Sequence, residues 1–338
     1  MSTKKILIVT EANERIASGH LFECIVCADY FQSHGLYTDL MVNKDMPFQL
    51  GQRIPNGYLT YQRNIQEEPD YLISCINRDL YQTVIFNLRE INNGFLKNIK
   101  KKTNSCLICI DEFGNRRLDA DIIINPMIDE NYWNYDTDAK LYCGEQYLVL
   151  PLDLQEYHQK KKNIKKNIDT ITISMGGVDC GNTTMKLAEW LPQIAGDINM
   201  NVVLGGGYLH RDMLETVIAG NDKVHIYQNI SYLSRLFFES DLAICAGGNT
   251  LHELAVIGTP AIVVPSMPHE VKNGEAYQRK GFSLCGNNSF LFEKAELKEL
   301  YETIKEEIVR RKMSYRGKMI ADGKGFRRIY DIVSQIMI

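Results

Sequence analysis

The sequence lacks several features that would assign a function directly. None of its apolar runs approaches the ~20 residues of a membrane-spanning helix, and the start Met-Ser-Thr-Lys-Lys leads into a strand pattern rather than a signal peptide. A net charge of −4 gives no general attraction to nucleic acid. There is no P-loop, and no GxGxxG fingerprint at the first turn. We therefore expect a cytoplasmic enzyme with no nucleic-acid partner and no integral membrane segment.

The nine cysteines indicate neither a disulfide framework nor a metal site. Their number is odd and they are spread through strand and helix patterns, as in a reducing compartment. Cys106 and Cys109 have a CxxC spacing, but they lie in a predicted strand, where residues three apart point to opposite faces. Cys24 and Cys27 repeat the spacing in an apolar helical pattern, where they fit as small core residues. We predict that the chain binds no metal.

Apolar runs typical of buried strands alternate with helical patterns along the chain, which predicts an α/β fold with parallel sheets. The segment 158–168 interrupts them with five lysines, and could be a basic patch or, as we favour, a solvated linker. We expect an N-terminal Rossmann-like domain over 1–157 and a second over 169–338, with ligands bound where the strand ends of two doubly wound halves face a cleft. The candidate strands are residues 5–10, 39–42, 83–86, 106–110, 122–124, 147–150, 170–175, 200–204, 224–227, 241–245 and 261–264.

A glycine turn between a strand and a helix is the best candidate for a binding site. Gly247, Gly248, Asn249 and Thr250 follow one apolar run and precede a periodic helical segment. Such a turn aims backbone N–H groups and a helix N-terminus at one point, which suits a phosphate. Glu253 could accept hydrogen bonds from ribose hydroxyls. Alternatively, it closes a capping box with Thr250, and spacing alone does not decide.

A second candidate lies between the first strand and the first helix. It comprises Arg15, Gly19 and His20, with His20 at a helix N-terminus facing the expected cleft. The positive helix end favours a neutral imidazole that can act as a base. The alternative is an ordinary capping or surface histidine. Three weaker candidates could equally be plain turns or surface residues. Gly176 and Gly177 could contact a distal phosphate, and Asp111 could be a second catalytic residue that positions a sugar or water. His269 and Glu270 could hold sugar hydroxyls.

Together these residues resemble a known family. Five motifs resemble, in order, those of the pseudaminic-acid pathway UDP-sugar hydrolases and the related spore-coat polysaccharide biosynthesis proteins. They are residues 15–20, the turn 110–116 with the strand segment 120–125, the turn 173–179, the segment 241–260 and the motif 322–327. That family has the GT-B architecture, two Rossmann-like domains facing a central cleft, also seen in the lipid-II-forming N-acetylglucosaminyltransferase.

The resemblance implies a UDP-sugar in the cleft. Its diphosphate would lie on Gly247, Gly248 and Asn249, and its uracil would lie near residues 225–227, which include Tyr227. Its ribose would contact Glu253, so the resemblance favours the ribose role of Glu253 over the capping box. His20 would activate water to release UDP with inversion, without metal or cofactor. This implies a hydrolase acting on a UDP-activated acetamido- or diacetamido-deoxy sugar in bacterial surface-glycan biosynthesis.

Three departures from the family pattern cluster at the sugar end. Glu23 stands where the family has arginine, and we expect it to contact the substrate. Ala17 replaces a glycine, and His269-Glu270 replaces an Asn-Gln pair. The nucleotide end is well kept, so we expect a relative with a changed acceptor or substrate. The alternatives are a GT-B glycosyltransferase that uses a cell-surface glycan acceptor and a non-catalytic sugar-nucleotide binding module. No feature of the sequence predicts the sugar or the oligomeric state.

Overall fold

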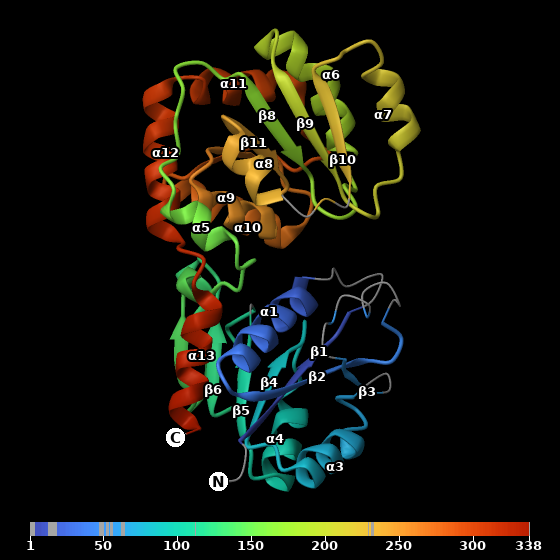
Figure 1. Cartoon of the computed structure of the whole chain (residues 1–338), viewed down its shortest axis with the longest axis vertical. Helices are drawn as coiled ribbons and strands as arrows, with labels where there is room; N and C mark the ends of the chain where they lie inside the picture. The colour runs from blue at the N-terminus through green and yellow to red at the C-terminus, as the bar shows by residue number, and fades with distance from the viewer. Residues whose placement is uncertain are drawn as a thin grey trace. The chain divides into compact units, whose positions relative to one another are not determined.

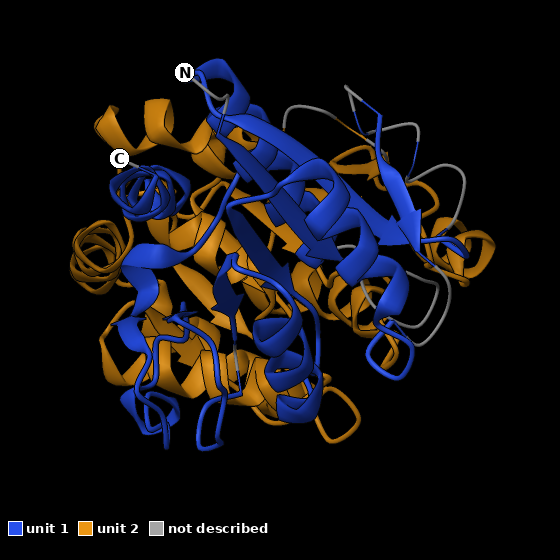
Figure 2. Cartoon of the chain, turned by 90° about the horizontal axis from the view of Figure 1, so that it is seen from below, with its two compact units in different colours: residues 1–151, 324–338 blue, residues 152–323 orange. Residues whose placement is uncertain are grey.

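The chain folds into two compact units. The computed structural model describes residues 4–12, 19–46, 51, 54, 57–61, 65–111, 113–228, 230 and 233–337. Unit 1 comprises residues 1–151 and 324–338, and unit 2 comprises residues 152–323 (Figures 1 and 2). None of the helices in these described ranges combines the length and the apolar composition that a bilayer span requires.

Unit 1 is built on a seven-stranded sheet in the order β3-β2-β1-β4-β5-β6-β7, and every pairing in it is parallel. Within β1, Ile6 and Ile8 face a core shared with α1 and α13, while Leu7 and Val9 face the core under α3 and α4. Successive side chains of the strand point to opposite faces of the sheet, and helices pack against both faces. The elements are β1 (Lys5–Thr10), α1 (Gly19–Ser33), β2 (Tyr37–Asn43), β3 (Leu59–Tyr61), α3 (Asp70–Asp79), β4 (Thr83–Asn87), α4 (Asn93–Lys102), β5 (Cys106–Ile110), β6 (Ile122–Asn125), η1 (Glu130–Tyr132), β7 (Lys140–Cys143), η2 (Glu145–Tyr147) and α13 (Gly325–Ile336).

Unit 2 repeats the plan with a six-stranded parallel sheet in the order β10-β9-β8-β11-β12-β13. The order reverses at β8 and β11, which are neighbours, and this is the switch point where doubly wound sheets bind ligands. The elements are α5 (Leu154–Gln159), β8 (Thr170–Ser174), α6 (Thr183–Ala195), β9 (Asn199–Leu204), α7 (Arg211–Val217), β10 (Val224–Gln228), α8 (Leu233–Glu239), β11 (Leu242–Cys245), α9 (Asn249–Ile257), β12 (Ala261–Val263), α10 (Pro268–Arg279), β13 (Ser283–Cys285), α11 (Lys294–Ile304) and α12 (Glu307–Ile320).

The two units differ from the expected domains in two segments, the lysine-rich segment 158–168 and the last helix. The lysine-rich segment belongs to unit 2, where the buried ammonium of Lys162 donates to the carbonyls of Phe237, Phe238 and Ser240 at the end of α8. The last helix, α13, packs on α1 of unit 1 through Phe326 and its apolar neighbours (Figure 1). Apolar periodicity shows that such a helix is half buried, but it does not show in which core.

The prediction of a strand at residues 147–150 was wrong. Residues 147–150 form no strand; Tyr147 ends the short helix η2, and the edge strand beside β6 is β7, at Lys140–Cys143. All four residues of β7 are exposed or half-buried, so the strand lacks the continuous apolar run that identified the inner strands.

Candidate functional site

The glycine turn lies where β11 ends and α9 begins. Gly247 has φ +101°, and a Cβ there would lie 2.8 Å from the carbonyl oxygen of Glu270. Gly248 has φ −81°, and a Cβ on it would approach no protein atom closer than 3.8 Å. Gly247 therefore fixes the turn, while Gly248 borders open space. Because Gly248 is also the N-cap and has no side chain, the first turn of α9 has no side-chain cap and can receive an anion.

Glu253 projects from α9 beside this turn. The helix begins at Asn249, so Thr250 lies inside it and cannot be the N-cap; the capping-box alternative is wrong. Within the described part of the chain, the structure gives the Glu253 carboxyl no hydrogen bond and no ion pair. Burial, with a smaller contribution from Asp153, raises the pKa of Glu253 to about 8. A half-buried carboxyl with no protein partner among the described residues can accept hydrogen bonds from a ligand once it is ionised.

Glu270 stands at the start of α10, against the same turn. Its Oε2 accepts hydrogen bonds from the backbone N–H groups of Ser266 (2.8 Å) and Met267 (2.9 Å). One oxygen therefore caps the helix, which leaves only the other for the predicted sugar contact. The pKa of Glu270 is raised by burial, against the opposing effect of these two N–H groups. The neighbouring His269 is exposed.

Asn273, one turn further along α10, is a residue that the sequence did not single out. Its Nδ2 donates to the carbonyl of Gly247 (3.1 Å), so it ties the glycine turn to α10. Its Oδ1 is buried without a partner among the described residues. The available signal was the three-residue spacing from Glu270, which places both side chains on one face of the helix.

The turn at Gly176 and Gly177 follows β8, the strand next to β11, so both glycine turns lie at the carboxyl edge of one sheet. Both glycines are exposed, and the carbonyl of Gly177 accepts from the N–H of Gly207 (2.9 Å). Asp179 is not exposed: its two oxygens accept from the N–H groups of Thr183 and Thr184, each at 2.8 Å, so it caps α6. The glycines thus remain candidates for a phosphate contact, whereas Asp179 is structural.

Tyr227 lies on β10, at the edge of this sheet. Three strand spacings separate β10 from β11, or about 14 Å at ~4.8 Å each. Tyr227 is half-buried near the carboxyl end of its strand. It is therefore far enough from the glycine turn to meet the base end of a nucleotide rather than the phosphates.

In unit 1, His20 lies in the first turn of α1 and meets a side chain that the sequence did not single out. Its Nδ1 is 2.8 Å from Oδ1 of Asn87, the last residue of β4. Nδ2 of Asn87 in turn donates to Oε2 of Glu23 (2.9 Å). Asn87 is 1% exposed, whereas His20 and Glu23 are half-buried. The available signal was a polar residue at the carboxyl end of an apolar strand pattern. Gly19 is the first residue of α1, and Arg15 lies outside the described residues.

Asp111, predicted to be catalytic, is instead committed to the fold. Its side chain is 1% exposed and forms an ion pair with Arg116. Its Oδ2 also accepts from the N–H of Gly114 (3.0 Å) and the hydroxyl of Tyr135 (2.6 Å). With both oxygens engaged and almost no exposure, Asp111 holds the loop after β5 rather than presenting a carboxylate to a ligand.

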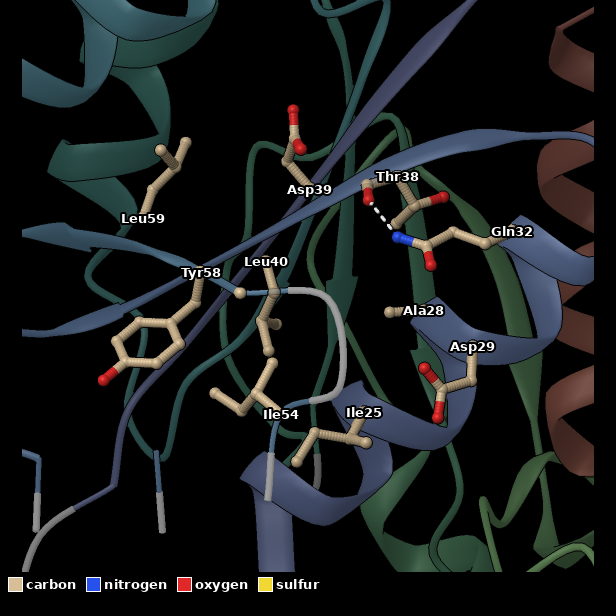
Figure 3. Close-up of a pocket in the computed structure, with 11 residues that line it drawn as sticks. Ile25, Ala28, Asp29, Gln32, Thr38, Asp39, Leu40, Ile54, Tyr58 and Leu59 are labelled. Atoms are coloured by element: carbon tan, nitrogen blue, oxygen red, sulfur yellow. Dashed lines mark hydrogen bonds between the residues drawn. The ribbon is translucent and has the colours of Figure 1, made fainter. Parts of the chain in front are cut away.

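A separate pocket of about 190 Å³ lies between α1 and β2 (Figure 3). It is lined by Asp29 and Gln32 from α1 and by Thr38 and Asp39 from β2, and Gln32 Nε2 donates to the carbonyl of Thr38 (2.7 Å). These residues lie in the last turns of α1 and the first half of β2, whereas His20 lies at the opposite end of α1. The pocket is therefore not part of the His20 cluster.

Two doubly wound units, the second with a helix N-terminus at its switch point, define the GT-B class. The structure of MurG from Acinetobacter baumannii superimposes with a TM-score of 0.72 at 14% identity, covering 98% of this chain and 99% of that one. The chain therefore has the GT-B fold. Residues 174–329 match the model of the glycosyltransferase family 28 C-terminal domain, and most of this stretch lies in unit 2.

Curated relatives extend the likeness beyond unit 2. The chain is 21% identical over 277 residues to the spore coat polysaccharide biosynthesis protein SpsG of Bacillus subtilis, covering 80% of this chain and 81% of SpsG. It is 25% identical over 270 residues to MJ1062 of Methanocaldococcus jannaschii, covering 77% of this chain but 55% of that protein. It is also 25% identical over 190 residues to a UDP-N-acetylglucosamine–N-acetylmuramyl-(pentapeptide) pyrophosphoryl-undecaprenol N-acetylglucosamine transferase of Acetivibrio thermocellus. That match covers 54% of this chain and 52% of the transferase.

These relatives bear unequally on the expected activity. The named ones are a polysaccharide biosynthesis protein and a glycosyltransferase, and none of them is named a hydrolase. The expectation of a hydrolase and of a pseudaminic-acid-type sugar gains no support from them. The transferase alternative fits the comparisons better.

Proposed function

We propose that this protein transfers a sugar from a UDP-sugar to an acceptor hydroxyl during the synthesis of a polysaccharide. The observation that carries the proposal is the turn at Gly247 and Gly248, which leads into an uncapped helix N-terminus with open space beside Gly248. Backbone N–H groups aimed at such a space stabilise a diphosphate both when it is bound and when it leaves with an extra negative charge.

The donor would lie along the carboxyl edge of unit 2. Its diphosphate would contact Gly248 and Asn249, with Gly176 and Gly177 within one strand spacing. Glu253 would accept from the ribose hydroxyls, because its half-buried carboxyl has no other partner in the described chain. The base would lie toward Tyr227. The spacing between β10 and β11, about 14 Å across the sheet, supports this order of base, ribose and diphosphate because it suits the length of a nucleoside diphosphate.

His20 would act as the general base. Its imidazole would take the proton of the acceptor hydroxyl as that oxygen attacks the anomeric carbon, and the bond from that carbon to the diphosphate would break with its electron pair going to the diphosphate. A single displacement of this kind inverts the anomeric configuration. Supporting the role is the hydrogen bond from His20 to the buried Asn87, which holds the ring in one orientation.

Hydrolysis is the second candidate, because a base that activates a hydroxyl can also activate water. Acceptor dependence separates the two. We would incubate the protein with UDP-N-acetylglucosamine and related UDP-amino sugars and measure UDP release with and without glycan and lipid-linked acceptors. A transferase releases little UDP until an acceptor is added, since its closed site excludes water from the anomeric carbon. Equal release of UDP and free sugar in buffer alone would establish the hydrolase.

Two histidine variants test the base in the same assay. His20→Ala should lower turnover by roughly two to four orders of magnitude while the donor still binds. His34→Ala is the matched control, because His34 is an exposed histidine just beyond the other end of α1. If His20→Ala abolishes donor binding as well as turnover, His20 is a binding or structural residue rather than the base.

A further inference from the structure

Three polar side chains of unit 1 form a hydrogen-bonded chain that the proposed reaction does not by itself require. His20 and Glu23 are three residues apart on α1, so they lie on the same face of the helix. The buried Asn87 lies between them and contacts both, through Oδ1 to His20 Nδ1 (2.8 Å) and through Nδ2 to Glu23 Oε2 (2.9 Å). The amide therefore connects a carboxylate to an imidazole.

The orientation of that amide decides which nitrogen of His20 carries the hydrogen. A carboxylate only accepts hydrogen bonds, so it selects the orientation in which Asn87 presents Nδ2 to Glu23 and Oδ1 to His20. The carbonyl oxygen also only accepts, so Nδ1 of His20 must donate. The flipped amide would place two acceptor oxygens against each other at Glu23 and would favour the Nε2–H form of the ring.

We propose that Glu23 is a positioning residue that sets the tautomer of His20 through Asn87, so that the neutral ring is protonated at Nδ1 and accepts its proton at Nε2. The inference rests on the proposed role of His20 as the base. When Nε2 takes the proton of the acceptor hydroxyl, the ring becomes an imidazolium, and the Nδ1–H bond to Asn87 strengthens because the amide is already polarised by Glu23. A charge-assisted hydrogen bond favours this orientation by roughly 10- to 100-fold.

Nuclear magnetic resonance of the ¹⁵N-labelled imidazole tests the tautomer directly, at a pH where the ring is neutral. We expect His20 of the unmodified 338-residue chain to be almost entirely in the Nδ1–H form. In Glu23→Gln the amide at position 23 can either donate or accept, so both orientations of Asn87 become allowed and the Nε2–H form should rise to a comparable population. Asp29→Asn is the control: it removes a carboxylate from the same helix, and the structure records no hydrogen bond of Asp29 within the described residues.

A double variant separates positioning from general damage. In Glu23→Gln with Asn87→Asp, the carboxylate moves next to His20, where it accepts from Nδ1–H while the new glutamine donates to it. We expect the Nδ1–H form to return. In the acceptor-dependent assay, kcat should fall about two- to tenfold in Glu23→Gln and recover in the double variant. Neither variant should change KM for the donor. Thermal melting confirms that each variant is folded.

The outcomes distinguish the inference from the proposed function. A wild-type ring protonated at Nε2, or a tautomer population that Glu23→Gln leaves unchanged, would overturn the role of Glu23. A tautomer that shifts as expected while kcat stays constant would uphold the chain from Glu23 to His20 and would remove His20 as the base.

Discussion

The state of the Glu253 carboxyl predicts how nucleotide binding depends on pH. Its pKa in the free protein is raised to about 8, chiefly by burial, so it is protonated over most of the range in which an ordinary glutamate is ionised. Ribose hydroxyls that donate to this group need the carboxylate, so binding must release a proton. At pH 8 about half of the molecules carry the carboxylate, at pH 7 about a tenth and at pH 6 about a hundredth. The association constant should therefore fall about fivefold from pH 8 to pH 7 and about tenfold more by pH 6.

Calorimetry with UDP-N-acetylglucosamine at pH 6, 7 and 8 measures this slope. Its esterified diphosphate lacks the second ionisation near pH 6 of a terminal phosphate, so the charge of the ligand stays constant. Titrations in two buffers with different ionisation enthalpies count the released proton. In Glu253→Gln the slope should vanish, because the amide does not titrate. Affinity that is flat in the wild type, that falls as the pH rises, or that keeps its slope in the glutamine variant would refute the ribose contact.

The same carboxyl gives an independent check of the sign through folding. Because its pKa is raised in the folded protein from the ordinary value of 4.5, its contribution to stability is fully present below pH 4.5 and is lost as the pH rises toward 8. The loss is at most about 1.4 kcal/mol for each pH unit. Glu253→Gln does not lose this stability, because the amide does not titrate. The melting temperature of the variant minus that of the wild type should therefore grow from pH 5 to pH 8. A difference that stays constant would show that Glu253 is not desolvated.

Three further predictions concern neighbouring residues. Gly248→Ala should weaken UDP binding and leave the melting temperature unchanged, because its Cβ fits the protein but enters the phosphate space, whereas Gly247→Ala should lower the melting temperature through a strain of about 1–3 kcal/mol. Asp111→Asn should destabilise unit 1 by about 3–5 kcal/mol in denaturant unfolding, because it breaks a buried ion pair, without changing the affinity for UDP. Lys162→Met should cost about 1–3 kcal/mol by uncapping α8, again with normal UDP binding by calorimetry.

The sequence predicted the sheets and the glycine turn because both have local signals. Inner strands of a parallel sheet are continuous apolar runs, and glycines between a strand and a helix mark a turn. The edge strand β7 and the return of α13 to unit 1 have no such signal, since they depend on which core buries a half-apolar segment. The capping-box alternative at Thr250 shared its spacing with the ribose contact. Only the observed helix start at Asn249 excluded it.

The roles of single polar residues were the hardest to predict, because a sequence does not show their partners. Asp111 has the position of a catalytic acid, at the carboxyl end of a strand, yet Arg116 and Tyr135 occupy its oxygens. Lys162 has the appearance of a solvated linker residue, yet it is buried on three carbonyls. Asn87, at the carboxyl end of a strand, was not singled out from the sequence, yet it contacts His20. In each case long-range packing, rather than local pattern, decided the role.

The acidic side chains around the glycine turn of unit 2 need an explanation, since an anionic donor is proposed to bind there. Both oxygens of Asp179 accept from the N–H groups that begin α6. One oxygen of Glu270 accepts from the two N–H groups just before α10. Helix N-termini therefore offset the charge of both carboxylates. Glu253 is kept protonated below about pH 8 by burial. The first turn of α9 has no side-chain cap, although the N–H of Leu251 donates to the carbonyl of Gly248 (2.9 Å). In the proposed complex, the diphosphate would therefore meet the N–H groups at the very start of this helix, and Glu253 would remain for the hydroxyls of the ligand.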